Sequence, residues 1–326
     1  AEGGNMLFAS VDNLGQITRN DAYIDLHIDE ILALDLVNVK AIKAANLKVV
    51  VDGVNSTGGI AIPLLLEALG VQPVKLFCTP NGEFPHNPEP LKEHLGDLMR
   101  EVVTQGADFG IVVDPDVDRL AFVDEKGEMF GEEYTLVAVA DYVLANTSGN
   151  TVSNMSSSRA LRDITNKHNG SYTASAVGEV NVVQMMKDTK AVIGGEGNGG
   201  IIYPELHYGR DSLVGVALFL SHLVEQKTTV SGLRASYPSY FMSKQKIALT
   251  PEIDVDAILE KMADTYKAEE ITTIDGVKID FESNWVHLRK SNTEPIIRIY
   301  TEAVTQDAAD SLANTIIKEI KQIAGL

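Results

Sequence analysis

The sequence predicts an α/β protein of several domains: two α/β domains with parallel or mixed sheets, then a C-terminal α+β domain with an antiparallel sheet. Three observations predict this class. The chain has 326 residues, more than one ordinary domain. Short apolar runs alternate with helical patterns through residue 240, as expected of parallel sheets. After residue 241, closely spaced strand-like runs with few intervening helices favour an antiparallel sheet.

The first 45 residues contain helical patterns without strands of their own. Residues 22–34 place Ile24, Ile28 and Ile31 on one side of a helix, and 37–45 form a second helical segment. These pieces cannot build a sheet with its own core. We therefore expect residues 1–45 to be the remnant of a first α/β domain that packs on its neighbour.

Residues 46–149 form the first complete alternating unit. Its expected strands are 47–51, 74–78, 109–113 and 120–124, and its expected helices are 60–69, 90–105 and 134–145. The glycine-rich segment 52–59 lacks the Lys-Ser/Thr ending and the spacing of a phosphate-binding P-loop. It is therefore interpreted as a tight strand-to-helix turn.

Two further units follow, at 150–240 and 241–326. The first repeats the alternation, with strands expected at 151–153, 172–176 and 191–193 and helices at 157–167, 179–187 and 211–225. The second has expected strands at 241–248, 274–279, 285–289 and 296–302, and expected helices at 254–266 and 307–323.

Composition excludes several function classes. A net charge of −19 argues against nonspecific nucleic-acid binding, and no apolar run is long enough to span a membrane. The single cysteine, Cys78, excludes an internal disulfide and favours a reducing compartment, so we expect a cytoplasmic protein. The chain lacks both an initiator Met and a signal peptide, which suggests a processed form or a fragment. Nothing in the sequence indicates an oligomeric state.

A cluster of carboxylates follows the apolar run 109–113. Asp114, Asp116 and Asp118 stand at alternate positions just past a strand end, which suits the oxygen coordination of Mg²⁺. A plain polar turn is one alternative. A calcium loop is another, because Glu125 occupies the twelfth position, but Arg119 stands at the sixth position where such a loop needs Gly. The favoured interpretation is a magnesium and phosphate site.

A glycine-rich loop at 194–200 follows another strand end. Glu196 and Asn198 offer a carboxylate and an amide at alternate positions, suited to bidentate hydrogen bonding with vicinal hydroxyls. A flexible turn is the alternative. The histidines show no metal-ligand spacing, and among them only His207 is expected near this loop.

The segment 289–298 concentrates positive charge in an acidic chain. Arg289, Lys290 and Arg298 flank hydroxyl and amide side chains in a strand-loop-strand pattern. Arginine presents a planar fork to phosphate, and hydroxyls can complete the site. A hairpin tip with incidental charges is the alternative, but a phosphate pocket is favoured.

Three motifs in this order resemble the α-D-phosphohexomutase family: DPDVDR at 114–119, GEGNGG at 195–200 and RKSNTEPIIR at 289–298. The likeness extends from about residue 20 to the end. The resemblance implies three related α/β domains and a smaller α+β domain around a central cleft. It also implies interconversion of hexose 6-phosphates and hexose 1-phosphates through a phosphoserine and a bisphosphorylated sugar.

The resemblance assigns a role to each motif residue, with hexose phosphate as the substrate. It implies that Mg²⁺ is held by Asp114, Asp116 and Asp118, that Arg119 lies beside the transferring phosphoryl group, that the sugar is bound by Glu196, Asn198 and Gly199, and that the non-reacting phosphate is bound by Arg289, Ser291, Asn292, Thr293 and Arg298.

The chain departs from the family pattern at several points. Asn198 and Gly200 replace Ser and His of the usual sugar loop, and Pro115 stands where Gly is frequent. Nothing matches the Thr-Ala-Ser-His-Asn-Pro loop that carries the phosphoserine. Ser56 and the serines at 156–158 are poor substitutes, because no adjacent base or metal loop is expected beside them.

Two hypotheses follow from the missing serine loop. The first is a truncated phosphohexomutase, inactive by itself and most similar to members assigned to glucosamine phosphate, with mannose and glucose phosphates as alternatives. The second is a non-catalytic sugar-phosphate binding protein. The first hypothesis requires the acidic loop and the cationic segment to face one shared hollow.

Overall fold

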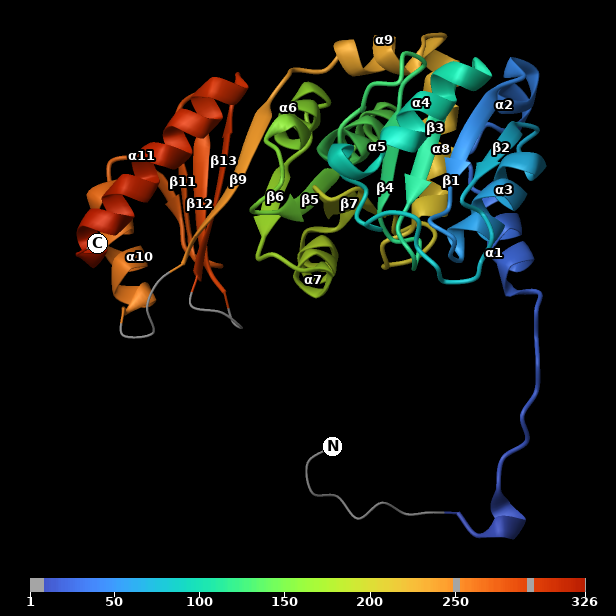
Figure 1. Cartoon of the computed structure of the whole chain (residues 1–326), viewed down its shortest axis with the longest axis horizontal. Helices are drawn as coiled ribbons and strands as arrows, with labels where there is room; N and C mark the ends of the chain where they lie inside the picture. The colour runs from blue at the N-terminus through green and yellow to red at the C-terminus, as the bar shows by residue number, and fades with distance from the viewer. Residues whose placement is uncertain (1–8, 249–252, 292–295, 326) are drawn as a thin grey trace.

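The computed structural model describes residues 9–248, 253–291 and 296–325. Figure 1 shows three units side by side, in chain order from right to left. Residues 9–22 extend away from them as an exposed segment with one short 3₁₀ turn, η1 (Val11–Asn13). Within the described ranges, no helix combines the length and apolarity needed to cross a bilayer.

The first unit contains a four-stranded sheet with the strand order β2-β1-β3-β4. Strands β1 to β3 are parallel and β4 is antiparallel to β3, so the predicted strands are confirmed in a mixed sheet. Its elements are α1 (Tyr23–Leu32), α2 (Val39–Ala45), β1 (Lys48–Asp52), α3 (Gly58–Ala68), β2 (Gln72–Leu76), η2 (Lys92–His94), α4 (Gly96–Gln105), β3 (Phe109–Val113) and β4 (Leu120–Val123). Helix α4 begins later than predicted, because Pro88 and Pro90 favour extended backbone before it.

The second unit repeats this topology with the order β6-β5-β7-β8, again with only the last strand antiparallel among those described. Its elements are β5 (Asn150–Asn154), α6 (Ala160–Lys167), β6 (Tyr172–Ser175), α7 (Glu179–Thr189), β7 (Ala191–Glu196), β8 (Gly200–Ile202), α8 (Ser212–Gln226) and α9 (Val230–Ala235). The sequence did not predict β8 or α9. Strand β8 makes the glycine-rich loop a tight hairpin turn at 197–199.

Helix α5 (Glu132–Asn146) lies between the two sheets, where it contacts β4 of the first and β7 of the second. Its residues 134–144 are all buried, which explains why it lacks a polar stripe. Together with α8 it joins both units into one hydrophobic core, in which Phe122 and Phe219 stack at 3.8 Å between ring centroids. The shared core fixes the loops of the two sheets relative to each other.

The third unit is an antiparallel sheet, as predicted for the α+β domain, with the order β10-β11-β12-β13-β9. The sequence predicted four of these strands but not β10. Its elements are β9 (Phe241–Ala248), α10 (Val255–Thr265), β10 (Glu270–Thr272), β11 (Val277–Asp280), β12 (Trp285–Lys290), β13 (Ile296–Ala303) and α11 (Gln306–Ala324). The two helices cover one face and enclose a separate core. The opposite face is turned toward the second unit (Figure 1).

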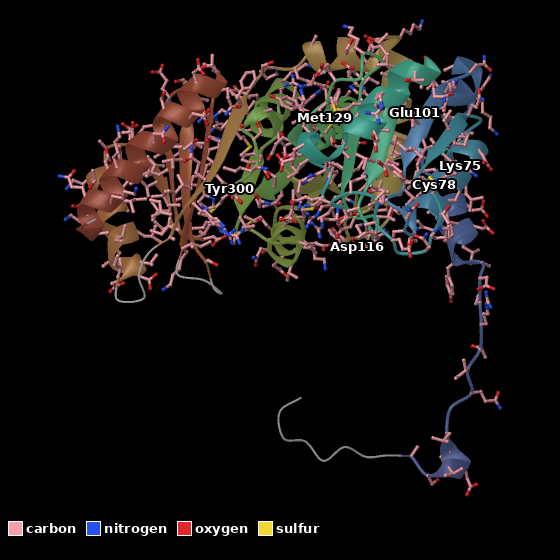
Figure 2. All side chains as sticks on the ribbon, viewed as in Figure 1. Lys75, Cys78, Glu101, Asp116, Met129 and Tyr300 are labelled. Atoms are coloured by element: carbon pink, nitrogen blue, oxygen red, sulfur yellow. The ribbon has the colours of Figure 1, made fainter. Side chains whose placement is uncertain are left out.

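Both α/β sheets have a topological switch point, between β1 and β3 in the first and between β5 and β7 in the second. Ligands of open α/β sheets bind outside the carboxyl ends of the strands at such points. The loops at 114–119 and 197–199 follow β3 and β7 at this edge. In Figure 2, Asp116 lies at the lower edge of the three packed units, the edge where β12 ends in Figure 1.

Candidate active site

The acidic loop after β3, here called the metal loop (residues 114–119), folds around the first of its carboxylates. Asp114 Oδ1 accepts hydrogen bonds from the backbone N–H groups of Asp118 and Arg119, both at 3.0 Å. Val117 has a φ of 61°, an uncommon value for a β-branched residue. This turn brings the carboxylate oxygens of Asp114, Asp116 and Asp118 within 4.8 Å of one another.

The electrostatics of the metal loop fit a divalent cation. Burial and the negative charges of Asp118 and Asp116 raise the pKa of Asp114 to about 6. Asp118 Oδ1 is buried and has no hydrogen-bond partner among the described residues. A cation bound there would pair this oxygen and relieve the repulsion, and carboxylate oxygens are the ligands that Mg²⁺ prefers.

Arg119 lies at the edge of the metal loop with its side chain partly exposed. Its Nε is 3.4 Å from Asp114 Oδ2, and its Nη1 is 3.5 Å from Glu89 Oε1. Glu89 belongs to the proline-rich loop at 80–90, and no sequence pattern predicted that this loop would lie here. The guanidinium is thus held between the metal loop and a second loop of the same sheet edge.

The glycine-rich turn after β7, here called the sugar loop (residues 195–200), contacts the metal loop directly. The backbone N–H of Leu120 donates to Gly199 O at 3.1 Å. Gly199 has a φ of 88°, and a Cβ there would lie 2.1 Å from Leu120 O, so only glycine fits. Asn198 Oδ1 accepts from the backbone N–H of Gly200 at 3.2 Å.

Glu196 is held from three sides and is 5% exposed. Its Oε1 accepts from Asn154 Nδ2 at 2.9 Å and from the backbone N–H of Gly178 at 3.2 Å. Its Oε2 accepts from Arg210 Nη1 at 2.9 Å. The carboxylate therefore has a fixed orientation before any ligand binds.

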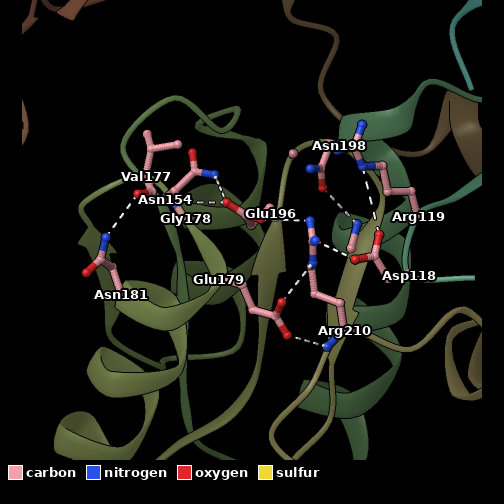
Figure 3. Close-up of polar contacts among 12 residues, drawn as sticks. Asp118, Arg119, Asn154, Val177, Gly178, Glu179, Asn181, Glu196, Asn198 and Arg210 are labelled. Carbon is pink, nitrogen blue, oxygen red and sulfur yellow. Dashed lines mark hydrogen bonds and ion pairs between the residues drawn. The ribbon is translucent and has the colours of Figure 1, made fainter. Parts of the chain in front are cut away.

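Arg210 is a site residue that the sequence analysis did not identify. Figure 3 shows its guanidinium between Glu196 of the sugar loop and Asp118 of the metal loop, and it donates to both. Its Nε is 3.5 Å from Glu179 Oε2 at the start of α7. Its only sequence signal is the neighbouring Asp211, which caps α8 through the N–H groups of residues 213 and 214.

His207 lies next to this cluster, as expected, and shares Asp211 with His27 of α1. The two Nε2 atoms are 3.0 and 2.7 Å from Asp211 Oδ2. The backbone N–H of Gly209 donates to His207 Nδ1, so Nε2 carries the proton and donates to Asp211. Burial would raise the pKa of Asp211, but the hydrogen bonds from both imidazoles hold that pKa well below its usual range. We interpret this group as a hydrogen-bonded cluster, not a metal site.

The predicted phosphate segment presents positive charge on the uncovered face of the third sheet. Arg289 and Arg298 stand opposite each other in the β12-β13 ladder. Arg289 Nε pairs with Asp275 Oδ2 at 2.9 Å, whereas Arg298 is exposed. Arg298 lines a groove of about 320 Å³ with Lys244 and Lys246 of β9. The alternation of these lysines along a strand could have identified them from sequence.

Two predicted phosphate residues, Asn292 and Thr293, lie outside the described residues. Ser291 is described, and its backbone N–H donates to Ile296 O at 3.0 Å.

Lys244 connects the third unit to the two loops. Its Nζ is 3.0 Å from Glu132 Oε1, and it lines a small pocket with Arg119 and Asn198. It also lines the groove of Arg298. Lys244 is thus common to a pocket beside the metal and sugar loops and to the groove of the cationic strands. The single shared hollow that the sequence interpretation requires stays a prediction.

Two serines have neighbours that we did not expect. Ser56 Oγ donates to Pro115 O of the metal loop at 2.8 Å, and Ser156 Oγ lies 2.9 Å from His287 Nδ1. The expectation that neither a metal loop nor a base adjoins these serines was wrong. A carbonyl cannot take the proton of Ser56, and burial lowers the pKa of His287 to about 4, which makes it a weak base. Among the described residues, neither serine thus has an effective base for nucleophilic attack.

Comparison with known proteins identifies the domains. Residues 25–127 match the model of phosphoglucomutase/phosphomannomutase alpha/beta/alpha domain II, 131–240 match that of domain III, and 245–319 match that of the C-terminal domain. The boundary between the domain II and domain III matches lies at 127–131, before α5. The sequence analysis placed this boundary at 149–150.

Two similar proteins have names that agree with these domain models. A phosphoglucomutase/phosphomannomutase of Thermococcus kodakarensis is 36% identical over 96% of this chain and 69% of its own length. A probable phosphoglucosamine mutase of Methanopyrus kandleri is 31% identical over 98% of this chain and 70% of its own length.

Among solved structures, a phosphoglucomutase/phosphomannomutase family protein of Burkholderia thailandensis superposes with a TM-score of 0.75 and 25% identity. The match covers 87% of this chain but only 63% of that protein. Three domain models and two relatives above 30% identity therefore agree: the chain belongs to the phosphoglucomutase/phosphomannomutase family.

Proposed function

We propose that this chain carries the metal, sugar and phosphate sites of a phosphohexomutase. Such an enzyme interconverts hexose 6-phosphate and hexose 1-phosphate through a phosphoserine and a bisphosphorylated sugar. The proposal is supported above all by Lys244, which lines one pocket with Arg119 and Asn198 and another with Arg298. A sugar phosphate bound across these residues would have its reacting end and its anchored end held by different units.

At the reacting end, Asp114, Asp116 and Asp118 would hold Mg²⁺, which when bound supplies charge stabilisation for the transferring phosphoryl group. Arg119 would donate to the oxygens of the same group. Its position beside Glu89 and Asp114 supports this role, because a guanidinium held in place needs little reorganisation as charge develops.

In the middle of the site, Glu196, Asn198 and Gly199 would bind sugar hydroxyls. Three donors already orient the carboxylate of Glu196, so its free lone pairs point in fixed directions. Fixed acceptors distinguish hydroxyl positions better than mobile ones, because a mismatched sugar leaves a buried polar group unpaired.

At the anchored end, Arg298, Arg289 and Ser291 would bind the phosphate that does not react, together with Asn292 and Thr293, which lie outside the described residues. The exposed position of Arg298 beside Lys246 supports this role. Bidentate arginine–phosphate contacts give both affinity and orientation.

We propose a hexosamine phosphate as the preferred substrate, with glucose and mannose phosphates as alternatives. The likeness of the sugar and phosphate loops to glucosamine-phosphate members supports the first, as does the relative named a probable phosphoglucosamine mutase. The relative named a phosphoglucomutase/phosphomannomutase supports the alternatives. One amino or hydroxyl group separates these sugars.

We further propose that the 326-residue chain binds its ligand but turns over little by itself, because no segment of it matches the serine loop of the family. The test is calorimetric titration of the chain with Mg²⁺ and with glucosamine 6-phosphate, followed by a coupled mutase assay. We expect metal-dependent binding and negligible turnover.

The three hexose phosphates, titrated in parallel, rank the substrates. Absence of hexose phosphate binding would contradict the proposed function. Substantial turnover that is lost in Asp116→Asn would contradict the proposed inactivity and support the enzyme.

A further inference from the structure

We propose that Arg210 is an internal counter-cation of the metal loop. In the chain without a divalent cation, its guanidinium neutralises Asp118, and it therefore weakens the binding of a divalent cation to that carboxylate. The same guanidinium orients Glu196, so one side chain links the metal loop to the sugar loop. The inference rests on the proposed function for the identity of the two loops.

The contacts of Arg210 show a residue shared among acidic groups from separate segments. Its side chain is 13% exposed. The guanidinium donates to Asp118 and to Glu196 (Figure 3) and lies near Glu179, whose Oε1 also accepts from the backbone N–H of Arg210 at 3.0 Å. The position of a guanidinium among three carboxylates depends on its attraction to each of them. A change at one carboxylate therefore moves the guanidinium relative to the other two.

The sugar loop is shaped to admit this side chain. A Cβ at Gly200 would lie 2.4 Å from Cδ of Arg210, closer than two such atoms can approach. The stem of Arg210 therefore passes directly over Gly200, a position where the sequence departs from the family's usual loop. The glycine and the arginine form a matched pair, because any side chain at 200 displaces the guanidinium.

The two oxygens of Asp118 have different environments. Oδ2 accepts from Arg210, whereas Oδ1 is buried without a hydrogen-bond partner in the described structure. Arg210 thus occupies Oδ2, whereas Oδ1 has only Arg119 Nε nearby, at 3.9 Å, and is the oxygen open to a divalent cation. Two cations that contact one carboxylate repel each other. The guanidinium of Arg210 therefore lowers the affinity of Asp118 for a divalent cation by roughly tenfold or more.

Arg210 opposes cation binding at Asp118, but it supports sugar binding through Glu196. Asn154 and Gly178 occupy Oε1, whereas in the described structure Oε2 has only Arg210 as its donor. Without the guanidinium, Glu196 loses this contact and faces Asp118 and Glu179 with no cation between them. Sugar binding then weakens while cation binding strengthens, a pair of opposite changes that general loss of structure does not produce.

The test uses the complete 326-residue chain, with Mn²⁺ as the metal probe and glucosamine 6-phosphate as the sugar probe. Mn²⁺ binding is followed by electron paramagnetic resonance, and sugar binding by calorimetry at saturating Mn²⁺. For Arg210→Met we expect Mn²⁺ to bind about tenfold more tightly or better and the sugar phosphate to bind about tenfold more weakly.

A lysine variant separates charge from geometry. Arg210→Lys keeps the positive charge, so its Mn²⁺ affinity should stay near that of the wild type. Its single ammonium cannot span both carboxylates, so its sugar phosphate affinity should fall.

A glycine variant tests the matched pair without changing any charge. Gly200→Ala displaces Arg210 and should change both affinities in the direction of Arg210→Met. Arg100→Met and Gly96→Ala serve as controls, because Arg100 is exposed on α4 and a Cβ at Gly96 meets no atom within 4 Å. Thermal denaturation confirms that each variant is folded.

Unchanged or weaker Mn²⁺ binding in both Arg210→Met and Gly200→Ala would overturn the proposal, as would binding of no Mn²⁺ by any variant. Mn²⁺ binding by Arg210→Met but not by the wild type would support the proposal. Failure of the wild type to bind the sugar phosphate would count against the proposed function, and the Mn²⁺ measurements would still decide the role of Arg210.

Discussion

The hydroxyl of Ser156 lies 2.9 Å from Nδ1 of His287, although 131 residues separate them in the chain. His287 Nε2 donates to Asp275 O at 2.7 Å, so Nδ1 has a free lone pair and accepts from the serine. The contact joins the second unit to the sheet of the third. The imidazole is 1% exposed, and burial lowers its pKa to about 4.

This histidine makes the stability of the chain depend on pH. Its pKa in the folded chain is below the unfolded value of about 6.5, so between these values only the unfolded chain binds the proton. Stability therefore falls as the pH falls from about 6.5 to about 4. We expect the wild type to lose about 2 kcal/mol more than His287→Gln between pH 7 and pH 5, measured by urea unfolding. Equal losses would show that His287 titrates normally.

Arg159 makes a further contact between these units, and its removal should weaken their association. Its Nη2 donates to the carbonyl of Asn284 at 2.9 Å, and its Nε is 3.8 Å from the fully buried Glu302. Arg159→Met leaves that carboxylate with less positive charge nearby, so we expect a loss of about 3–5 kcal/mol of stability. Urea unfolding measures it, and limited proteolysis should release the third unit. The exposed Arg100→Met should lose less than about 0.5 kcal/mol.

Asp116 is exposed at the mouth of the metal loop, so its substitution tests metal binding with little effect on folding. Asp116→Asn removes one charge from a site of three carboxylates. We expect the Mg²⁺ affinity to fall by about tenfold or more, as measured by calorimetry. Asp188→Asn, an exposed change on α7, should leave the affinity unaltered. Equal affinities of the two variants would remove Asp116 from the metal site.

Arg298 should distinguish phosphorylated from unphosphorylated sugars. Arg298→Met removes a forked donor from the groove that it shares with Lys246. A charge-assisted hydrogen bond contributes about 1.5–3 kcal/mol. We therefore expect the affinity for glucosamine 6-phosphate to fall by about tenfold or more. Competition by inorganic phosphate should weaken in parallel. Lys318→Met, exposed on α11, is the control. Retained phosphate competition would place the phosphate site elsewhere.

Patterns within short segments determined much of this protein. The alternation of apolar runs with helical spacing predicted the elements of the two α/β sheets, and the six residues 114–119 alone predicted a metal loop. Such features depend on neighbouring residues, whose backbone sterics and side-chain periodicity act over a few positions. The hairpin strand β8 was missed, because three residues among glycines show no periodicity.

The tertiary structure decided which distant residues meet. The contacts of Arg210 with Asp118 and Glu196 could not be predicted from spacing, nor could the contact of Glu89 with Arg119. For Lys244, spacing could predict the strand face but not the pocket that it shares with other units. Each contact depends on how strands order in a sheet and on how α5 and α8 fuse two sheets into one core. The sequence by itself therefore determined the chemical groups of each loop, because these are local. Bringing these loops to a common edge required packing over the whole chain, because strand ends from separate units come together only when the units fold and pack against each other.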